Sequence, residues 1–396
     1  MLSEMRVELH NVGCIKDADI RLNGITVLTG YNSTGKSTVL KTVYALLSSQ
    51  HDVRKRVMED IEERVALAQR FYSLSDEDDG SSDTLQRLSA VLSKNESNKE
   101  LPASFLKELA LMKDYLEGKT RTSVFSKRYL VDCVEQEFGG QMFTLGSEGG
   151  FARITLDDGT LISVDAGGGT SVVDEAMVSS VSYVDTPLVL DQDIVFAISY
   201  RSSDFNHRSD LTDKLFYDGK TDVFGSIVSE ESVSKLDSTV SKALSGTLRR
   251  TKKSLVYDSE EVKGVKASNL ASGMKVFAII RILMDNGYLK EGDVLLIDEP
   301  EIHLHPEWQL ILAELLASMN KELGIRLLIT THSPQFLLSL EAFSAKLDVD
   351  MDFYEASVDF PHVFIDNGKN LSPVYRKMAD AMQKADTLRD GYDRVE

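Results

Sequence analysis

The sequence of 396 residues contains only two cysteines, Cys14 and Cys133, which lie far apart and form no Cys-x-x-Cys pair. This scarcity offers no cysteine zinc site and fits a reducing compartment, so we expect a cytoplasmic protein. Runs of about 18 apolar residues are also missing, and we therefore expect no transmembrane helix. The first residues lack the apolar core that is typical of a signal peptide.

Positive charge is in short supply as well. The chain has 44 lysine and arginine residues against 63 aspartate and glutamate residues, which gives a net charge of −19 and a pI of about 4.9. A surface that binds DNA or an anionic membrane over its whole area is therefore disfavoured, whereas a local basic groove is not. The most basic stretch, residues 249–253, is a candidate contact for nucleic acid or an acidic partner, although a solvated turn before a strand is the favoured interpretation.

A complete phosphate-binding loop is present near the N-terminus. Residues 30–37 read Gly-Tyr-Asn-Ser-Thr-Gly-Lys-Ser and fit the pattern G-x-x-x-x-G-K-[ST] in full. The stretch 25–29 before it predicts a short buried strand, and the stretch 36–49 after it carries apolar residues at helical spacing. The glycines let backbone N–H groups turn toward phosphate oxygens at a helix N-terminus. Lys36 is expected to reach the β- and γ-phosphates, and the Ser37 hydroxyl is expected to hold Mg²⁺. The predicted nucleotide-binding residues of the loop are Gly30, Asn32, Ser33, Thr34, Gly35, Lys36, Ser37 and Thr38.

An acidic pair follows a second buried strand. Residues 293–299 read Asp-Val-Leu-Leu-Ile-Asp-Glu, and their adjacent apolar residues predict a fully buried parallel strand. Such a strand would place Asp298 beside the phosphate loop, where it can orient Mg²⁺. Glu299 would then lie where its carboxylate can polarise a water aimed at the γ-phosphate. His303 and His305 follow, but two histidines on an irregular turn at this spacing are not a convincing zinc site.

A histidine ends the next predicted strand. Residues 325–330 read Ile-Arg-Leu-Leu-Ile-Thr and are followed by Thr-His-Ser-Pro, with Pro334 suited to the first position of a helix. A helix over about 307–322, which ends at Gly324, is expected between this strand and the acidic pair. Lone histidines are usually structural. His332, however, stands at the end of a core strand next to the catalytic one, which suits contact with a γ-phosphate.

These patterns predict an α/β fold: a P-loop NTPase whose mixed sheet has a parallel core, with helices on both faces and an inserted α+β lobe. The composition, 42% apolar and 27% charged, is typical of a soluble globular protein. The inserted lobe would contain helices over 51–118 and a hairpin at 152–156 and 160–164. A strand over about 352–365 and a helix over about 372–388 would end the chain. The predicted division is 1–50 for the N-terminal part of the ATPase head, 51–180 for the inserted helical and hairpin region, 181–265 for the continuation of the head with a helical lobe, 266–345 for the part with the acidic pair and His332, and 346–396 for the strand and helix that complete the head.

In this order, the segments resemble the ABC-type ATPases of the RecF, SMC and OLD (overcoming lysogenization defect) branch. GYNSTGKST resembles the Walker A loop of that family, LLIDEPEIHLHP its Walker B strand and ITTHSP its switch-histidine loop. The resemblance spans residues 5–48 and about 266–340. NLASGMK is similar to the family's signature segment, but Ala271 stands where the family usually has a serine. YVDTPLVLD is similar to a segment of stand-alone ATPase subunits in bacterial anti-phage modules such as Septu and PARIS.

The resemblance implies ATP hydrolysis in a sandwich of two chains. ATP and Mg²⁺ are therefore the expected cofactors, and a homodimer or higher homo-oligomer is the expected assembly. Gln192 or Asp185 would serve as the glutamine-loop residue. The remaining assignments are Lys36, Glu299 and His332 for catalysis, Ser37 and Asp298 for the metal, and Ser272 and Gly273 for the nucleotide of the partner chain.

The favoured function is an ATP-driven switch that controls a separate effector or nuclease in anti-phage defence. Acidic charge, moderate length and the lack of a fused nuclease pattern favour it. A RecF-like DNA repair ATPase is the main alternative, with the basic stretch 249–253 as its local support, so nucleic acid is a candidate partner and a membrane is not. The ATPase subunit of a transporter is less favoured because the insertion after the phosphate loop resembles the non-transport branch. A nucleotide sensor without hydrolysis is disfavoured by Glu299 and His332.

Overall fold

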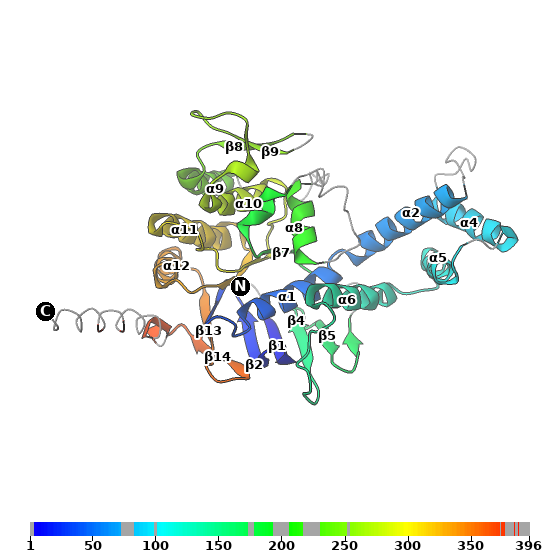
Figure 1. Ribbon diagram of the computed structural model, residues 1–396, viewed down its shortest axis with the longest axis horizontal. Coiled ribbons are helices and arrows are strands. Elements are labelled where there is room, and N and C mark those ends of the chain that lie inside the picture. Colours follow the sequence, from blue (N-terminus) through cyan, green and yellow to red (C-terminus); the bar gives the residue numbers. More distant parts are fainter. Residues whose placement is uncertain are drawn as a thin grey trace.

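The computed structural model of the chain describes residues 4–372, except 73–82, 99–100, 173–177, 193–205, 217–229 and 252–253, together with 374–376, 384 and 387. A head built on one large sheet carries a helical arm that projects from one end of the molecule (Figure 1). The helix predicted at 372–388 lies largely outside the described residues.

The head is organised around an eleven-stranded mixed sheet with the order β6-β5-β4-β1-β2-β14-β13-β3-β12-β11-β7. The strands from β13 to β7 in this order run parallel to one another. Because parallel strands end on the same side, the loops that follow β3, β11 and β12 meet at one edge, here called the carboxyl edge. The strands are β1 (Met5–Val12), β2 (Ile15–Leu22), β3 (Ile25–Thr29), β4 (Phe151–Thr155), β5 (Leu161–Asp165), β6 (Thr170–Ser171), β7 (Val181–Val184), β11 (Val294–Ile297), β12 (Arg326–Thr330), β13 (Met351–Ala356) and β14 (His362–Gly368).

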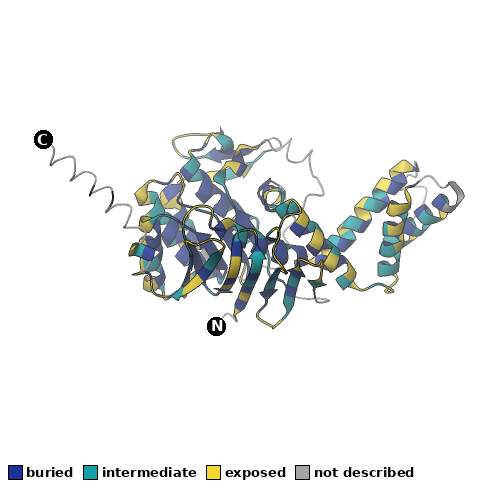
Figure 2. Ribbon diagram, turned by 60° about the horizontal axis from the view of Figure 1, so that its bottom comes forward, coloured by how far each residue is buried: buried dark blue, intermediate teal, exposed yellow. Residues whose placement is uncertain are grey.

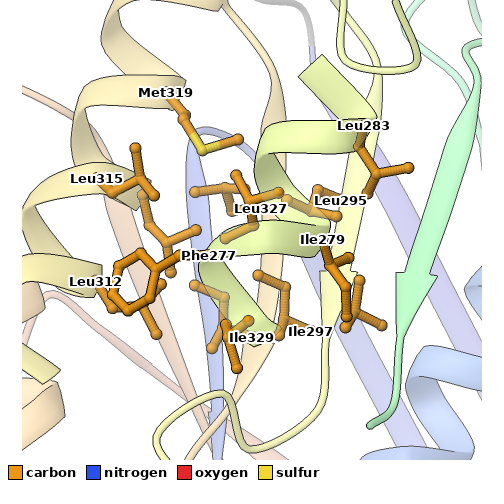
Figure 3. Packing of buried hydrophobic residues seen from close by; sticks show 14 of the residues in the cluster. Phe277, Ile279, Leu283, Leu295, Ile297, Leu312, Leu315, Met319, Leu327 and Ile329 are labelled. Carbon is orange, nitrogen blue, oxygen red and sulfur yellow. The ribbon is translucent and has the colours of Figure 1, made fainter. Parts of the chain in front are cut away.

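Helices cover both faces of the sheet (Figure 1). One face carries α1 (Lys36–Gln50) and α6 (Thr122–Phe138), and the other carries α10 (Ser272–Asp285), α11 (Pro306–Leu323) and α12 (Pro334–Leu347). Successive side chains of a strand point to opposite faces, so each fully apolar strand serves both cores. Leu296 packs in the core under α1, whereas Leu295 and Ile297 pack against α10 and α11 (Figure 3). The predicted parallel core with helices on both faces is confirmed.

The ends of the helices that flank the site are explained by their capping residues. Pro334 is the first residue of α12, as predicted, and the Ser333 hydroxyl accepts a hydrogen bond from the Phe336 N–H at 3.1 Å. Before α11, the His305 ring accepts from the Glu307 N–H at 3.4 Å. The predicted stop at Gly324 is confirmed: its φ of 66° is left-handed, which glycine adopts without strain.

The arm consists of α2 (Val53–Phe71), α4 (Thr84–Asn98) and α5 (Ala103–Leu116). Their apolar faces form a small core of their own, which includes Ile61, Val65, Leu109 and Met112. Figure 2 shows this buried interior in a part of the molecule that stands away from the head. The chain leaves the head through the end of α1 and returns through α6, so the arm connects to the helices beside the phosphate loop.

Two strand assignments differ from the sequence-based expectations. The hairpin β4–β5 extends the main sheet, because β4 pairs with β1 in a register that joins Leu9 to Ala152. The segment predicted as one strand over 352–365 forms two antiparallel strands, β13 and β14. The apolar pattern runs through both, but Asp359 and Pro361 are turn residues, and Pro361 has no N–H to donate to a ladder.

A second, three-stranded sheet lies beside α9 and α10 (Figure 1). It consists of β8 (Thr247–Arg250), β9 (Leu255–Asp258) and β10 (Val265–Lys266), and the helices that precede it in the chain are α8 (His207–Phe216) and α9 (Glu230–Ala243). The interpretation of the basic stretch as a turn is wrong for Arg249 and Arg250, which lie on β8, while Lys252 and Lys253 lie outside the described residues. Within the described ranges, every helix is too short or too polar to cross a bilayer.

Candidate nucleotide-binding and catalytic site

The phosphate loop joins the end of β3 to the start of α1. Gly30, Ser33 and Gly35 have φ values of 137°, 65° and 92°, so left-handed residues recur along the loop. This is the backbone pattern that gathers N–H groups around an anion. A Cβ on Gly35 would lie 2.6 Å from Ile15 Cγ1, so the loop requires glycine there to pass over the hairpin of β1 and β2. The sequence therefore forms the predicted loop between the predicted strand and helix.

Lys36 is buried at the floor of this loop. Its Nζ lies 3.2 Å from the Gly30 carbonyl oxygen, 3.0 Å from the Tyr31 carbonyl oxygen and 2.8 Å from His332 Nε2. Burial lowers the pKa of Lys36, while the nearby carboxylates, chiefly Glu299, act in the opposite direction. The ammonium group therefore lies at the carboxyl edge, next to the predicted acidic pair and histidine.

Asp298 follows β11 and is oriented from both neighbouring strands. The Thr330 hydroxyl of β12 donates to one of its carboxylate oxygens, and the Tyr183 hydroxyl of β7 donates to the other at 3.4 Å. The parallel register explains this arrangement, because Ile297 pairs with Ile329 on one side and with Val184 on the other. The Glu299 N–H donates to the same Thr330 hydroxyl at 2.9 Å. The acidic pair is therefore held by three adjacent strands.

Glu299 and His332 come together beside Lys36. Glu299 has a left-handed φ of 47°, and its Oε1 lies 2.9 Å from His332 Nε2. Burial and the Lys36 charge lower the pKa of His332, which keeps the ring neutral at neutral pH. As a neutral ring, Nε2 either accepts from Lys36 or donates to Glu299, so one proton position links both groups. The structure thus brings the three predicted catalytic residues, from three separate segments, into direct contact.

Glu301 has a role that sequence reasoning did not assign. Its Oε1 accepts hydrogen bonds from the Thr331 hydroxyl at 2.6 Å, the His332 N–H at 2.9 Å and the Ser333 N–H at 3.1 Å. The residue is only 8% exposed, and burial raises the pKa of its carboxyl group. Glu301 therefore attaches the loop that carries His332 to the turn after β11. A second acidic residue two positions after Glu299 was the available sequence signal.

The two glutamine-loop candidates both bond to residues of α8. Asp185 directly follows β7, and its Oδ2 accepts from Arg208 Nε at 2.8 Å and lies 3.2 Å from His207 Nε2. Gln192 Oε1 accepts from the Thr212 hydroxyl at 3.2 Å. Asp185 follows Val184, whose carbonyl oxygen accepts a hydrogen bond from the Asp298 N–H at 3.0 Å. Asp185 is therefore the candidate that adjoins the acidic pair.

The signature-like segment lies at the start of α10 and packs within its own chain. A Cβ on Gly273 would lie 2.9 Å from Leu304 Cδ2 and 3.3 Å from the His303 carbonyl oxygen, so glycine permits a close approach to the turn after β11. Ser272 is the first residue of the helix and Ala271 precedes it. The contact of Ser272 and Gly273 with a nucleotide stays a prediction, because it requires a second copy of the chain.

The residues predicted to place Mg²⁺ fit a hard cation. Ser37 and Asp298 supply hydroxyl and carboxylate oxygens, which Mg²⁺ prefers, and this ion usually takes only one or two protein ligands beside phosphate oxygens and water. Among the described residues, no cluster of three or more His, Cys, Asp or Glu side chains forms a metal cage of its own. His305 is occupied as the cap of α11.

The sheet order and the edge where these loops meet define the class. A phosphate loop after β3, an acidic pair after β11 and a histidine after the intervening β12 make this a P-loop NTPase with an ABC-type head, and the predicted fold class is confirmed. Residues 164–339 match the family model described as "AAA domain, putative AbiEii toxin, Type IV TA system". This match includes Glu299 and His332 but not the phosphate loop. No curated protein matches the chain.

Several solved structures are distantly similar. The SMC head domain from Thermotoga maritima is 10% identical, with a TM-score of 0.39 over 92% of this chain and 99% of that chain. An Smc head with an extended coiled coil, from Pyrococcus furiosus, is 10% identical, with a TM-score of 0.45 over 98% and 100%. A dimeric bacterial ABC transporter cassette is 11% identical, with a TM-score of 0.37 over 92% and 99%. The chain's own topology and site, together with the family match, support an ATPase of the ABC and AAA type.

Proposed function

We propose that the chain hydrolyses ATP at the carboxyl edge of its sheet. The observation that carries this proposal is the direct contact of Lys36, Glu299 and His332, which follow three different strands or loops. A lysine, a carboxylate and a neutral imidazole at this spacing suit attack of water on a phosphoryl group. A chance match of the phosphate loop would leave no reason for the other two side chains to meet it.

In the proposed reaction, Lys36 and the loop N–H groups bind the β- and γ-phosphates. Glu299 accepts a proton from the attacking water, the bond from the γ-phosphorus to the bridging oxygen breaks, and ADP and inorganic phosphate leave. His332 contacts the γ-phosphate and reports its presence to Glu299 through their shared hydrogen bond. Ser37 and Asp298 would hold Mg²⁺, which would neutralise charge on the phosphate oxygens when bound.

Steady-state ATP hydrolysis by the purified chain tests this proposal, with Lys36→Ala as the blank. We expect Mg²⁺-dependent release of phosphate that the blank lacks. GTP is run in parallel, because the loop contacts phosphates and does not by itself select a base. Equal, background-level phosphate release from the chain and from Lys36→Ala, with and without duplex DNA, would contradict the proposal.

We also propose that ATP closes a homodimer over the carboxyl edge. Exposed apolar side chains follow four of the parallel strands there: Tyr31 after β3, Leu188 after β7, Ile302 after β11 and Phe360 after β13. Apolar groups around a polar site suit a contact with another protein surface. Glu299→Gln with saturating ATP and Mg²⁺ should double in mass by light scattering. A monomer under these conditions would contradict the dimer.

The wider role proposed is that of a cytoplasmic switch for a separate effector in anti-phage defence. It is supported by the family description, which names a toxin of a Type IV toxin–antitoxin system, and by an arm that offers a surface away from the site. A partner that co-purifies with the Glu299→Gln variant in ATP and dissociates after exchange into ADP would support this role. The RecF-like alternative has less support, since Arg249 Nη2 is paired with Asp258 at 3.2 Å. Strong stimulation of hydrolysis by duplex DNA would favour that alternative.

A further inference from the structure

A continuous set of buried contacts runs from the helix that returns from the arm to the carboxylate predicted to place Mg²⁺. Glu137, in the last turn of α6, contacts His207 through both of its carboxylate oxygens. Its Oε1 lies 2.7 Å from the ring atom Nδ1, and its Oε2 accepts a hydrogen bond from the backbone N–H of His207 at 3.0 Å. The His207 ring stacks on Tyr183, with centroids 4.3 Å apart and planes inclined by 29°. The Tyr183 hydroxyl in turn donates to Asp298. None of these three residues has a part in the reaction described above.

The Tyr183 hydroxyl is buried and lies within hydrogen-bond distance of Asp298. The side chain is 1% exposed, and a buried hydroxyl requires a hydrogen-bond partner. Among the described residues that partner is Asp298 Oδ2. A phenol is protonated at neutral pH, so the Tyr183 hydroxyl is the donor and the Asp298 carboxylate the acceptor. With Thr330 bonded to the other oxygen, the carboxylate plane is fixed from two sides.

His207 fixes Tyr183 because it is itself held firmly. Its Nε2 lies 3.2 Å from Asp185 Oδ2, and Arg208 Nη2 lies 2.7 Å from the same oxygen. Lys41 of α1 approaches Glu137 at 3.7 Å. Burial opposes a charge on His207, but the neighbouring carboxylates of Asp185 and Glu137 outweigh it and raise the pKa of the ring. The His207 ring is therefore held from Glu137 and from Asp185, and it lies stacked on the Tyr183 ring.

We infer that Tyr183 is a positioning residue for Asp298 and that His207, held by Glu137, fixes the Tyr183 ring. The inference depends on the proposed function, because it concerns how well Asp298 serves Mg²⁺. Residues that orient a metal ligand typically alter metal affinity by about 10–100-fold when removed. If the aromatic cluster were merely structural, substitutions in it would lower the folding stability and leave the Mg²⁺ concentration required for hydrolysis unchanged.

The test is Tyr183→Phe with Tyr44→Phe as the matched control. Tyr44 is also 1% exposed and contacts the same His207 ring edge-on at 6.0 Å. Each variant loses one buried hydroxyl from one aromatic cluster, but of these two hydroxyls only that of Tyr183 donates to Asp298. The first readout is the Mg²⁺ concentration for half-maximal hydrolysis at saturating ATP. The second does not depend on turnover: Mn²⁺ bound in the presence of ATP, followed by electron paramagnetic resonance.

We expect Tyr183→Phe to raise the Mg²⁺ midpoint and the Mn²⁺ dissociation constant about tenfold, with ATP binding in excess metal unchanged. Tyr44→Phe should leave both metal readouts at the wild-type value. If Tyr183→Phe does not fold, His207→Gln replaces it, because loss of the stacked ring should shift the same readouts in the same direction. Unchanged metal readouts, or equal shifts in both tyrosine variants, would overturn the inference while wild-type hydrolysis keeps the proposed function intact. A wild-type chain that neither binds nor hydrolyses ATP would overturn the proposed function itself.

Discussion

The head and the arm use buried side chains for different purposes. At the carboxyl edge of the head, polar groups are buried and connected: Lys36 contacts His332, which contacts Glu299, and Glu301 accepts three hydrogen bonds from the loop of His332. In the arm, most buried side chains are apolar, with Ile61, Leu109 and Met112 fully enclosed, and the few buried polar ones, such as Asn95, bond to neighbours within the arm. The buried polar groups of the head come from distant segments and form one site, whereas the arm is mainly a packed apolar core.

This difference follows from the elements that build each region. Parallel strands bring loops from distant segments to one edge, so polar side chains from residues 30–37, 298–301 and 330–333 meet without interrupting the apolar core below them. Helices of the arm each contribute one apolar face, and the polar contacts between them are small, such as the pair of Tyr72 with Asn95. We therefore expect substitutions in the two regions to separate catalysis from stability.

The largest effect on the head should come from Glu299→Gln. The amide keeps the size of the side chain but cannot accept a proton from water, so kcat should fall by about 10²–10⁴-fold. ATP binding, measured with a fluorescent analogue, should persist, because Lys36 and the loop are untouched. Protection of arm amides from hydrogen exchange should also be unchanged. A variant that hydrolyses ATP at the wild-type rate would remove Glu299 from the mechanism.

The next effect lies in the arm. Leu109 is fully buried between α5 and its neighbours, so Leu109→Ala should destabilise the arm by about 2–5 kcal/mol through lost packing and a residual cavity. Hydrogen exchange should report faster opening of α2 and α5, while ATP hydrolysis stays at the wild-type level. Leu67→Ala, at a position 58% exposed on the same arm, is the control and should change neither readout. A parallel loss of hydrolysis with Leu109→Ala would mean that the arm and the site are coupled.

The residues at the carboxyl edge could be predicted because each follows a short apolar strand in a distinctive local pattern. Lys36 lies in a complete phosphate loop. The acidic pair 298–299 follows four adjacent apolar residues, and His332 lies two residues after a strand that has three adjacent apolar residues. His207 and Glu137 could not be predicted in the same way. They are 70 residues apart, lie on amphipathic helices, and become one buried pair only when α6 and α8 pack beside β7.

Local sequence patterns also could not predict which sheet each strand joins. The alternation in 152–156 and 160–164 predicts a hairpin equally well in a separate lobe or at the edge of the main sheet, and only the pairing of β4 with β1 decides between them. The same limit applies to the C-terminal segment. Apolar residues on either side of Asp359 and Pro361 gave the appearance of one strand, although the chain reverses there to pair β14 with both β13 and β2.

A smaller effect should separate positioning from chemistry within the head. Glu301→Ala would leave the Thr331 hydroxyl and the N–H groups of His332 and Ser333 without their shared acceptor. A buried donor without a partner costs about 1–3 kcal/mol, so we expect kcat to fall by about tenfold with little change in KM. Glu307→Ala, which removes an exposed carboxylate from the first turn of α11, is the matched control. Equal kcat values for the two variants would exclude a positioning role for Glu301.

The smallest effect expected is a pH dependence confined to the head. Burial and Lys36 lower the pKa of His332 in the folded chain below its ordinary value of about 6.5, so the unfolded chain takes up this proton first as pH falls. Folding stability should therefore decrease as pH falls through the ordinary histidine pKa toward the lowered one. Protonation would also leave Nε2 unable to accept from Lys36, which should reduce hydrolysis in the same pH range. Melting temperatures and kcat measured between pH 5 and pH 7.5 should show a shallower acid decline in His332→Asn than in the wild type. His303→Asn, on the exposed turn after β11, should retain the full decline, and identical profiles for all three proteins would mean that His332 does not titrate against Lys36.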